Sequence, residues 1–294
     1  MLTALVLAFG SPACVDEDSS DDDTDAGADA SSDTDTDSDT DTGPPDEIGP
    51  AGVFDETILV DGFSRHYQIH IPDSAIAAME EGPVGLLIAL HGAGDTADSF
   101  IAAVGLPATA AAHGFIVIAP DGYNKGWFVQ SDEGWPGTDG YDSSLPNDME
   151  FMLQMIAVTS ASYYIDVGAI FVAGHSRGAG CSGLMAMFSG GMEIASGTWV
   201  SPFAAYGINA GYDPSGGTVD LTTAEPKRPV WIIHGTIDTG VPYSMGEEFY
   251  NDLNAAGWDV TFTSVTDVGH TWLWRSQYGQ TNDDLWNFFM DNAN

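Results

Sequence analysis

The sequence predicts an α/β fold with a mostly parallel central sheet that is flanked by helices on both faces. Two observations carry this prediction. Short, continuous apolar runs are typical of buried strands, and segments of helical composition alternate with these runs along the chain. Because strands that alternate with helices imply crossover connections, the strands of such a sheet run mostly parallel.

The individual elements follow from apolar pattern and turn residues. Buried strands are predicted over residues 85–90, 115–119, 169–173, 203–208 and 230–233. A strand pair is predicted over residues 57–60 and 65–71, joined by the turn Asp61-Gly62, and the alternating segment 259–265 predicts a strand at the sheet edge. Helices are predicted over residues 98–113, 147–163, 177–188, 244–256 and 282–290. Ligands bind at the carboxyl ends of the strands in such sheets, so we expect the chemistry in the loops that follow them.

The first fifty residues differ sharply from the rest. They contain no Lys or Arg and carry fifteen acidic residues among Ser, Thr, Ala and Gly. Such a segment cannot bury enough apolar surface to offset the entropy of ordering it, so residues 15–50 predict a disordered acidic linker. The run 33–42 is dense in carboxylates but lacks the turn Gly and distal Glu of a calcium loop, and no metal site is predicted. Residues 51–294 are long enough for one α/β domain.

The N-terminal residues 1–14 form a candidate targeting segment. A short apolar stretch is followed by Ser11-Pro12-Ala13-Cys14, an order that resembles a bacterial lipoprotein signal in which Cys14 becomes lipidated. No basic residue precedes Cys14, so the alternative is an accidental resemblance or a start that lies upstream. The stretch is too short to span a membrane. The expectation is a secreted or cell-surface protein, with membrane anchoring through a lipid on Cys14.

Charge and cysteine content narrow the classes of partner. The formal net charge is −38, of which the acidic tail accounts for −15 and the remaining domain for −23. This balance excludes nucleic acid as a partner. It indicates a solvated, soluble surface, with adaptation to a salty habitat as the alternative. Cys14 and Cys181 do not make a disulfide framework, and Cys181 is expected to be a small buried residue.

A candidate nucleophile lies in Gly174-His175-Ser176-Arg177-Gly178, between a predicted buried strand and a predicted helix. This is the context of a nucleophile elbow, in which a sharp strand-to-helix turn exposes the serine hydroxyl. Small residues on either side let neighbouring segments pass closely. The pattern in this context predicts that Ser176 is a nucleophile.

A serine hydroxyl is a weak nucleophile, so the hypothesis requires a base and an orienting acid. Two histidines follow Ser176. His234 ends a buried strand and is expected to make structural hydrogen bonds, whereas His270 lies in a loop that can reach the serine. Asp238 begins the loop after a strand and is the predicted acid. Asp267 is the competitor, but it lies too close to His270 in sequence to turn back under the imidazole.

A tetrahedral intermediate needs hydrogen-bond donors for its oxyanion, each worth on the order of 3 kcal/mol of barrier. One predicted donor is the backbone N–H of Arg177. The other is expected from the loop after strand 85–90, where Ala93 is the first choice and Gly92 or Gly94 the alternatives. His91 precedes a turn glycine and is expected to brace this loop rather than to act in catalysis.

These motifs stand in one order along the chain: Leu90-His91-Gly92, Ala119-Pro120-Asp121-Gly122, Gly174-His175-Ser176-Arg177-Gly178, His234-Gly235 through Asp238 to Val241-Pro242-Tyr243, and Gly269-His270-Thr271-Trp272. By them, the chain resembles the polyhydroxybutyrate depolymerase and feruloyl esterase group of the α/β-hydrolase superfamily, from about Phe54 to the C-terminus. The resemblance implies the α/β-hydrolase fold and ester hydrolysis without a cofactor. It also implies a triad of Ser176, Asp238 and His270, in the chain order of these enzymes.

The same resemblance implies that His91-Gly92-Ala93 forms the oxyanion loop. Members of the group often carry Cys after the His-Gly pair and a small residue after the serine, where this chain has Ala93 and Arg177. Arg177 could narrow the pocket or pair with a nearby acid, so it bears on the choice of substrate.

Aromatic residues are frequent in the expected substrate loops, which contain Tyr123, Trp127, Phe128, Trp135, Trp272 and Trp274. An aromatic or polymeric ester could stack on such rings, and Trp127, Trp135 and Trp272 are the candidate substrate-binding residues. The alternative for these rings is ordinary packing.

The leading hypothesis is a serine esterase whose ester substrate is a polyhydroxyalkanoate oligomer, or a feruloyl or acetyl ester on plant polysaccharide. A peptidase of the same fold would need a further pocket or domain, for which residues 51–294 leave no stretch. The hypothesis from another class is an inactive, surface-tethered binding protein with the same fold. Fold analogy alone does not decide among them.

Overall fold

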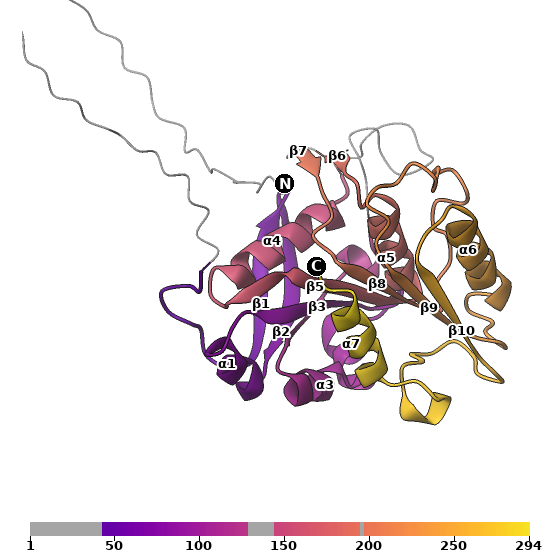
Figure 1. The fold of residues 1–294 in the computed structure, drawn as a ribbon. Coiled ribbons are helices and arrows are strands. Elements are labelled where there is room, and N and C mark those ends of the chain that lie inside the picture. The colour runs from indigo at the N-terminus through magenta and orange to yellow at the C-terminus, as the bar shows by residue number, and fades with distance from the viewer. Residues whose placement is uncertain (1–42, 129–143, 195–196) are drawn as a thin grey trace, which may run out of the picture. The chain divides into compact units, whose positions relative to one another are not determined.

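The computed structural model describes residues 43–128, 144–194 and 197–294 of the chain. Pro44–Asn294 form one compact unit. It is built on an eight-stranded sheet of order β1-β2-β4-β3-β5-β8-β9-β10 (Figure 1). The strands of this sheet are β1 (Gly52–Val60), β2 (Phe63–Ile71), β3 (Val84–Leu90), β4 (Ile116–Pro120), β5 (Ile165–His175), β8 (Ala205–Asn209), β9 (Val230–Gly235) and β10 (Val260–Val265). The helices are α1 (Asp73–Met79), α2 (Ala97–Val104), α3 (Leu106–His113), α4 (Asp148–Ser160), α5 (Arg177–Met187), α6 (Tyr243–Ala255) and α7 (Asn282–Asp291).

The sheet confirms the predicted fold class. From β4 to β10 all neighbouring strands run parallel, whereas β1 and β2 are antiparallel to their neighbours. Val60 pairs with Phe63, so Asp61 and Gly62 form the two-residue turn that the sequence predicts. Strand β10 stands at the sheet edge, also as predicted.

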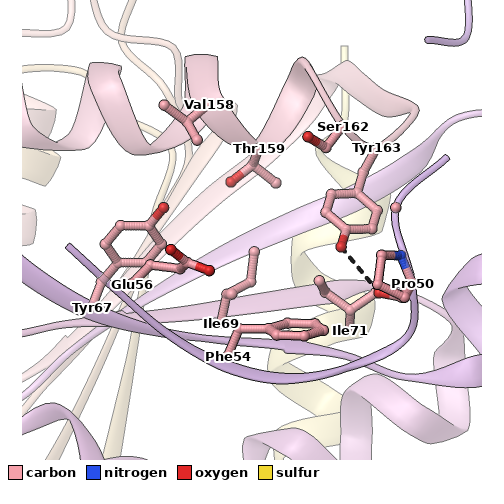
Figure 2. Close-up of a pocket in the computed structure, with 11 residues that line it drawn as sticks. Pro50, Phe54, Glu56, Tyr67, Ile69, Ile71, Val158, Thr159, Ser162 and Tyr163 are labelled. Carbon is pink, nitrogen blue, oxygen red and sulfur yellow. Dashed lines mark hydrogen bonds between the residues drawn. The ribbon is translucent and has the colours of Figure 1, made fainter. Parts of the chain in front are cut away.

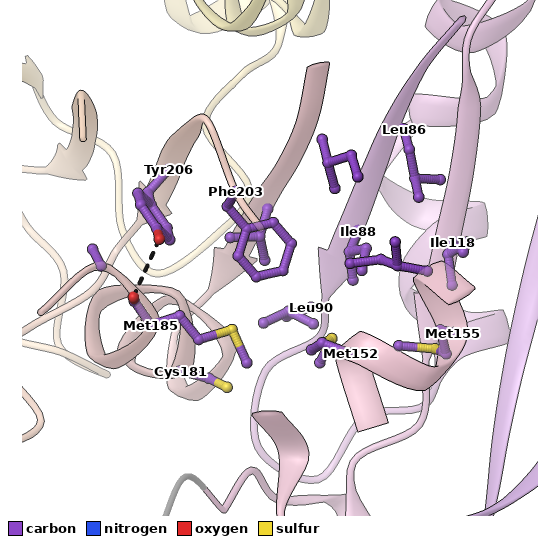
Figure 3. Close-up of a cluster of buried hydrophobic side chains, with 14 of the residues drawn as sticks. Leu86, Ile88, Leu90, Ile118, Met152, Met155, Cys181, Met185, Phe203 and Tyr206 are labelled. Carbon is purple, nitrogen blue, oxygen red and sulfur yellow. Dashed lines mark hydrogen bonds between the residues drawn. The ribbon is translucent and has the colours of Figure 1, made fainter. Parts of the chain in front are cut away.

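Strand β3 shows why the sequences of the buried strands are continuous apolar runs. All seven of its residues are buried, because the strand has a helical layer on each face. Leu86, Ile88 and Leu90 point into a cluster with α4 and α5, which Figure 3 shows together with Met152 and Met185. The intervening Leu87 and Ala89 face the opposite cluster, which includes side chains of α2, α3 and α7.

The predicted helix over residues 98–113 is two helices, α2 and α3, and the prediction of one continuous helix is wrong. The break falls at Gly105, whose φ of 77° lies in the left-handed region. Glycine adopts this conformation without a steric penalty from a Cβ, so α2 ends there. Pro107 lies in the first turn of α3, where a proline is favoured because its missing N–H would have no partner within the helix. The structure also contains two features that were not predicted from the sequence. They are α1 and a short hairpin of β6 (Met192–Ile194) and β7 (Gly197–Trp199).

A buried ion pair fastens β2 to the start of α4. Arg65 occupies an inward position of β2 and is 2% exposed, and its Nη2 lies 2.5 Å from Oδ1 of the fully buried Asp148. The other carboxylate oxygen of Asp148 accepts a hydrogen bond from the backbone N–H of Phe128. Burial raises the pKa of the Asp148 carboxyl, and the neighbouring Arg65 opposes that rise. The guanidinium also lies 4.1 Å from the centre of the Phe151 ring.

We predict that Arg65→Met lowers the free energy of unfolding by about 3–5 kcal/mol, because it leaves an uncompensated carboxylate in the interior. Urea unfolding at neutral pH measures the effect. The double variant Arg65→Met/Asp148→Leu should regain much of this loss, since it removes both charges. A loss below about 1 kcal/mol for Arg65→Met, as is usual for exposed pairs, would contradict the interpretation.

Candidate active site

The strand-to-helix turn at Ser176 has the strained geometry of a nucleophile elbow. Strand β5 ends at His175 and α5 begins at Arg177, with Ser176 between them at φ 56° and ψ −116°. A Cβ at Gly174 would overlap the backbone of Gly178, and a Cβ at Gly178 would overlap the carbonyl oxygens of the β3 end. Both glycines of the motif are therefore required by the close approach of neighbouring backbone.

His270 and Asp238 are hydrogen-bonded. His270 Nδ1 lies 2.7 Å from Asp238 Oδ2, and the Asp238 side chain is fully buried while that of His270 is 27% exposed. The second carboxylate oxygen accepts the backbone N–H groups of Gly240 and Val241 at 2.8 and 3.0 Å, which fixes its orientation. A Cβ at Gly240 would lie 2.7 Å from the His270 ring, so this glycine makes room for the imidazole.

Two loops lie beside the elbow at Ser176. The ring of His270 packs on the ring of His175, the residue before Ser176, with centroids 4.7 Å apart. A Cβ built on Gly92 would lie 3.4 Å from Ser176 Cβ, which places the loop after β3 against the elbow. The competing acid Asp267 is exposed, and in the described part of the chain its side chain has no contact with His270.

The predicted oxyanion donors keep their N–H groups available. Neither Ala93 N nor Arg177 N forms a hydrogen bond with another described residue, whereas Gly94 N donates to Lys125 O at 3.0 Å. Gly94 is thus occupied as a donor, while Gly92 remains an alternative. The exposed Arg177 side chain pairs with no acid in residues 43–128, 144–194 and 197–294, and its Nη1 lies over Gly126.

His91 braces the loop after β3, as the sequence predicts. It is fully buried, its Nδ1 lies 2.7 Å from Gly92 O, and its Nε2 accepts the backbone N–H of Gly122 at 2.9 Å. Because Gly122 N can only donate, the ring proton is on Nδ1, which donates to Gly92 O. Burial lowers the pKa of His91, which favours the neutral ring. Trp127 Nε1 donates to His91 O at 2.8 Å and strengthens the same loop.

Burial argues against a stacking role for two of the predicted substrate-binding tryptophans. Trp127 is 5% and Trp272 2% exposed. Trp272 donates from Nε1 to Asn282 Oδ1 at 2.9 Å and packs edge-on against Phe100. Both indoles are buried and hydrogen-bonded to neighbouring loop residues, which favours ordinary packing, the alternative stated for these rings. Trp135 and Cys14 lie outside the described residues.

His234 has a structural place, as expected. It is fully buried, and its Nε2 donates to Val241 O at 3.0 Å while lying 3.5 Å from Asp238 Oδ2. Burial lowers its pKa. Cys181 is buried, also as expected.

Two polar residues that the sequence did not predict join the site. His175 contacts His270, and Asn209 at the end of β8 contacts both His175 and the loop after His270. The available signal was position: Asn209 directly follows a predicted buried strand, at the edge of the sheet where the chemistry was expected.

The described residues contain neither a metal-binding cluster nor a membrane-spanning helix. No cluster of three or more His, Cys, Asp or Glu side chains suited to a metal lies within them, and none of their helices combines the length and apolar composition needed to cross a bilayer. A separate pocket of about 280 Å³ lies between β1, β2 and the end of α4 (Figure 2). It contains none of the predicted site residues.

The environment of His175 generates a pH prediction. Burial, with His270 nearby, lowers the pKa of His175 from 6.5 to about 4. Between these values the unfolded chain carries a proton that the native protein lacks, so stability is lost as the pH falls through this window, at about 1.4 kcal/mol per unit.

Urea unfolding of wild type and His175→Gln from about pH 7 to about pH 4.5 gives the free energy of unfolding of each protein as a function of pH. Carboxylates contribute to the slope of this dependence in both proteins, so the difference between the two slopes reports on His175. We expect a shallower loss of stability in the variant. Equal slopes in the two proteins would contradict the assignment.

Comparison with known proteins agrees with this geometry. A model of the phospholipase/carboxylesterase family matches residues 72–277. No curated protein sequence is similar enough to count as a relative.

The chain is similar in structure to a thermostable esterase, with TM-score 0.57 and 17% identity over 82% of this chain and 63% of that one. It is also similar to a ferulic acid esterase, with TM-score 0.58 and 17% identity over 82% and 97%. A third similar structure is an acetyl xylan esterase from Aspergillus awamori, with TM-score 0.55 and 18% identity over 81% and 100%. The structures show the shared fold, and the family match shows that this chain belongs to the phospholipase/carboxylesterase family of the α/β-hydrolases.

Proposed function

We propose that the protein is a serine esterase that hydrolyses carboxylic esters through an acyl-enzyme on Ser176. The observation that carries the proposal is the contact of 2.7 Å between His270 and a buried, doubly hydrogen-bonded Asp238. This contact fixes the proton of His270 on Nδ1 and leaves Nε2 free to accept a proton. The proposed triad then consists of Ser176, His270 and Asp238.

In the proposed reaction, His270 Nε2 accepts the Ser176 hydroxyl proton while Oγ attacks the ester carbonyl. The negative charge on the carbonyl oxygen is stabilised by the N–H groups of Arg177 and Ala93. Collapse of the intermediate breaks the bond to the alcohol, which takes the proton from His270. Water, activated by the same imidazole, then hydrolyses the acyl-serine and regenerates the enzyme.

For the substrate, we propose a polyhydroxybutyrate-like polyester, with a feruloyl or acetyl ester on plant polysaccharide as the alternative. The motif resemblance supports both, and the ferulic acid and acetyl xylan esterases among the similar structures favour testing the second. A panel of nitrophenyl esters, methyl ferulate, acetylated xylan and hydroxybutyrate oligomers separates them. We further propose secretion, with lipid attachment at Cys14. Release of a Cys14→Ser variant from the membrane fraction tests that step.

We predict that a fluorophosphonate probe labels the wild-type protein and that Ser176→Ala abolishes labelling, because Oγ is the atom that the probe modifies. Mass spectrometry of the labelled peptide measures the outcome. Labelling that persists in Ser176→Ala would refute the nucleophile. An unlabelled, folded wild type would instead favour the inactive binding protein.

We predict that Asp238→Asn lowers kcat by several orders of magnitude, about 10⁴-fold in the comparable serine-protease case, because it favours the wrong imidazole tautomer. Asp267→Asn is the matched control, since Asp267 is exposed and its side chain does not reach His270 in the described structure. Steady-state kinetics on a short-chain nitrophenyl ester measures both. A crippled Asp267→Asn beside an active Asp238→Asn would overturn the proposed triad.

A further inference from the structure

Asn209 is a fully buried residue whose hydrogen bonds join two parts of the proposed active site. It ends β8, between β5, which leads to the elbow, and β9. Its backbone carbonyl accepts the N–H of Ser176 at 3.0 Å. Its side-chain Nδ2 donates to His175 Nδ1 and to Thr271 O, each at 2.8 Å, and its Oδ1 accepts the N–H of Leu273 at 2.8 Å.

We propose that Asn209 is a positioning residue that holds the loop of His270 against the nucleophile elbow. The inference rests on the proposed function, because it concerns the alignment of that same triad. His270 lies directly before Thr271, so the bond to Thr271 O fixes the backbone on one side of the proposed base. The bond from Leu273 N fixes the same loop two residues further on.

The chemistry of the contacts explains why the residue is an asparagine. Leu273 N can only donate and Thr271 O can only accept, which determines the orientation of the amide. The second Nδ2 hydrogen then points to His175 Nδ1, which must accept it, so the ring proton of His175 is on Nε2. An aspartate of the same size would place an oxygen against Thr271 O and would leave that carbonyl without a donor.

The proposed role is separate from that of Asp238. The bond from Asp238 to His270 Nδ1 sets the tautomer and the rotation of the ring. That bond joins the ring to Asp238 and does not tie the backbone of the loop to β5. The Asn209 bonds supply this tie, because the same side chain contacts His175 on β5 and the backbone of the loop. Misplacement by about 1 Å in such a geometry can lower the rate about 100-fold.

The test compares Asn209→Ala and Asn209→Asp with wild type. Values of kcat and KM are measured on a nitrophenyl ester, and kcat is expressed per active site, with the number of active sites determined by titration with a fluorophosphonate. We expect kcat to fall about 100-fold in both variants, with little change in KM, because alignment and not substrate binding is lost. Wild-type kcat per titrated site in either variant would overturn the proposal, since the hydrogen bonds of the Asn209 amide would then be dispensable for alignment.

A matched control and a second readout separate positioning from simple loss of stability. Ser189→Ala removes a buried hydrogen bond from Ser189 Oγ to Pro226 O, at the far end of α5. It should lower the melting temperature without changing kcat per site. If it lowers kcat as far as Asn209→Ala does, the effect is general destabilisation and the proposal fails.

The second readout is the low-field proton NMR signal of His270 Nδ1–H, together with hydrogen exchange at Leu273 N–H in the wild type. Replacement of Asn209 should broaden that signal through faster exchange with water. An unchanged signal in a folded variant would overturn the inference. If neither variant folds, a rapidly exchanging Leu273 amide in the wild type would still overturn it. These readouts do not depend on catalysis, so they remain informative if Ser176 proves not to be the nucleophile.

Discussion

The arrangement of the site depends on how closely the backbone of β3, the elbow and α5 approach one another. At Gly174 and Gly178 no side-chain atom fits between these segments, and Ser176 takes the positive φ that the resulting turn requires. The strain is offset by the surrounding sheet, because the elbow backbone is bonded to β8 and every residue of β3 is buried. The position of the proposed nucleophile is thus a product of sheet packing rather than of the loop itself.

Two kinds of histidine surround the site. His91, His175 and His234 all have pKa values lowered by burial, and each donates or accepts hydrogen bonds that tie loops to strands. His270 is partly exposed and bonded to a buried carboxylate. A neutral imidazole suits bracing, because it makes directional bonds without the cost of burying a charge. A base must instead reach the reacting atoms.

Periodicity and motif context were sufficient to predict the sheet, the elbow and the contact between Asp238 and His270. These features follow from local pattern: apolar runs bury on two faces, and a glycine-flanked serine between strand and helix has few other conformations. The break at Gly105 was missed because a glycine in an apolar segment also fits a continuous helix. The burial of Trp272 and the role inferred for Asn209 depend on partners far away in sequence, which no local pattern reveals.

The hydrogen bonds of Asn209 join residues that are distant along the chain, and this has a consequence for folding. The elbow at Ser176, the end of β8 at Asn209 and the loop at Leu273 meet only when β5, β8 and β9 are all in register. Contacts between such distant segments form late, because the entropy of closing long loops must be met first. Ester hydrolysis would therefore return after helical content during refolding. Enzyme activity thus serves as a reporter of completed assembly of the sheet.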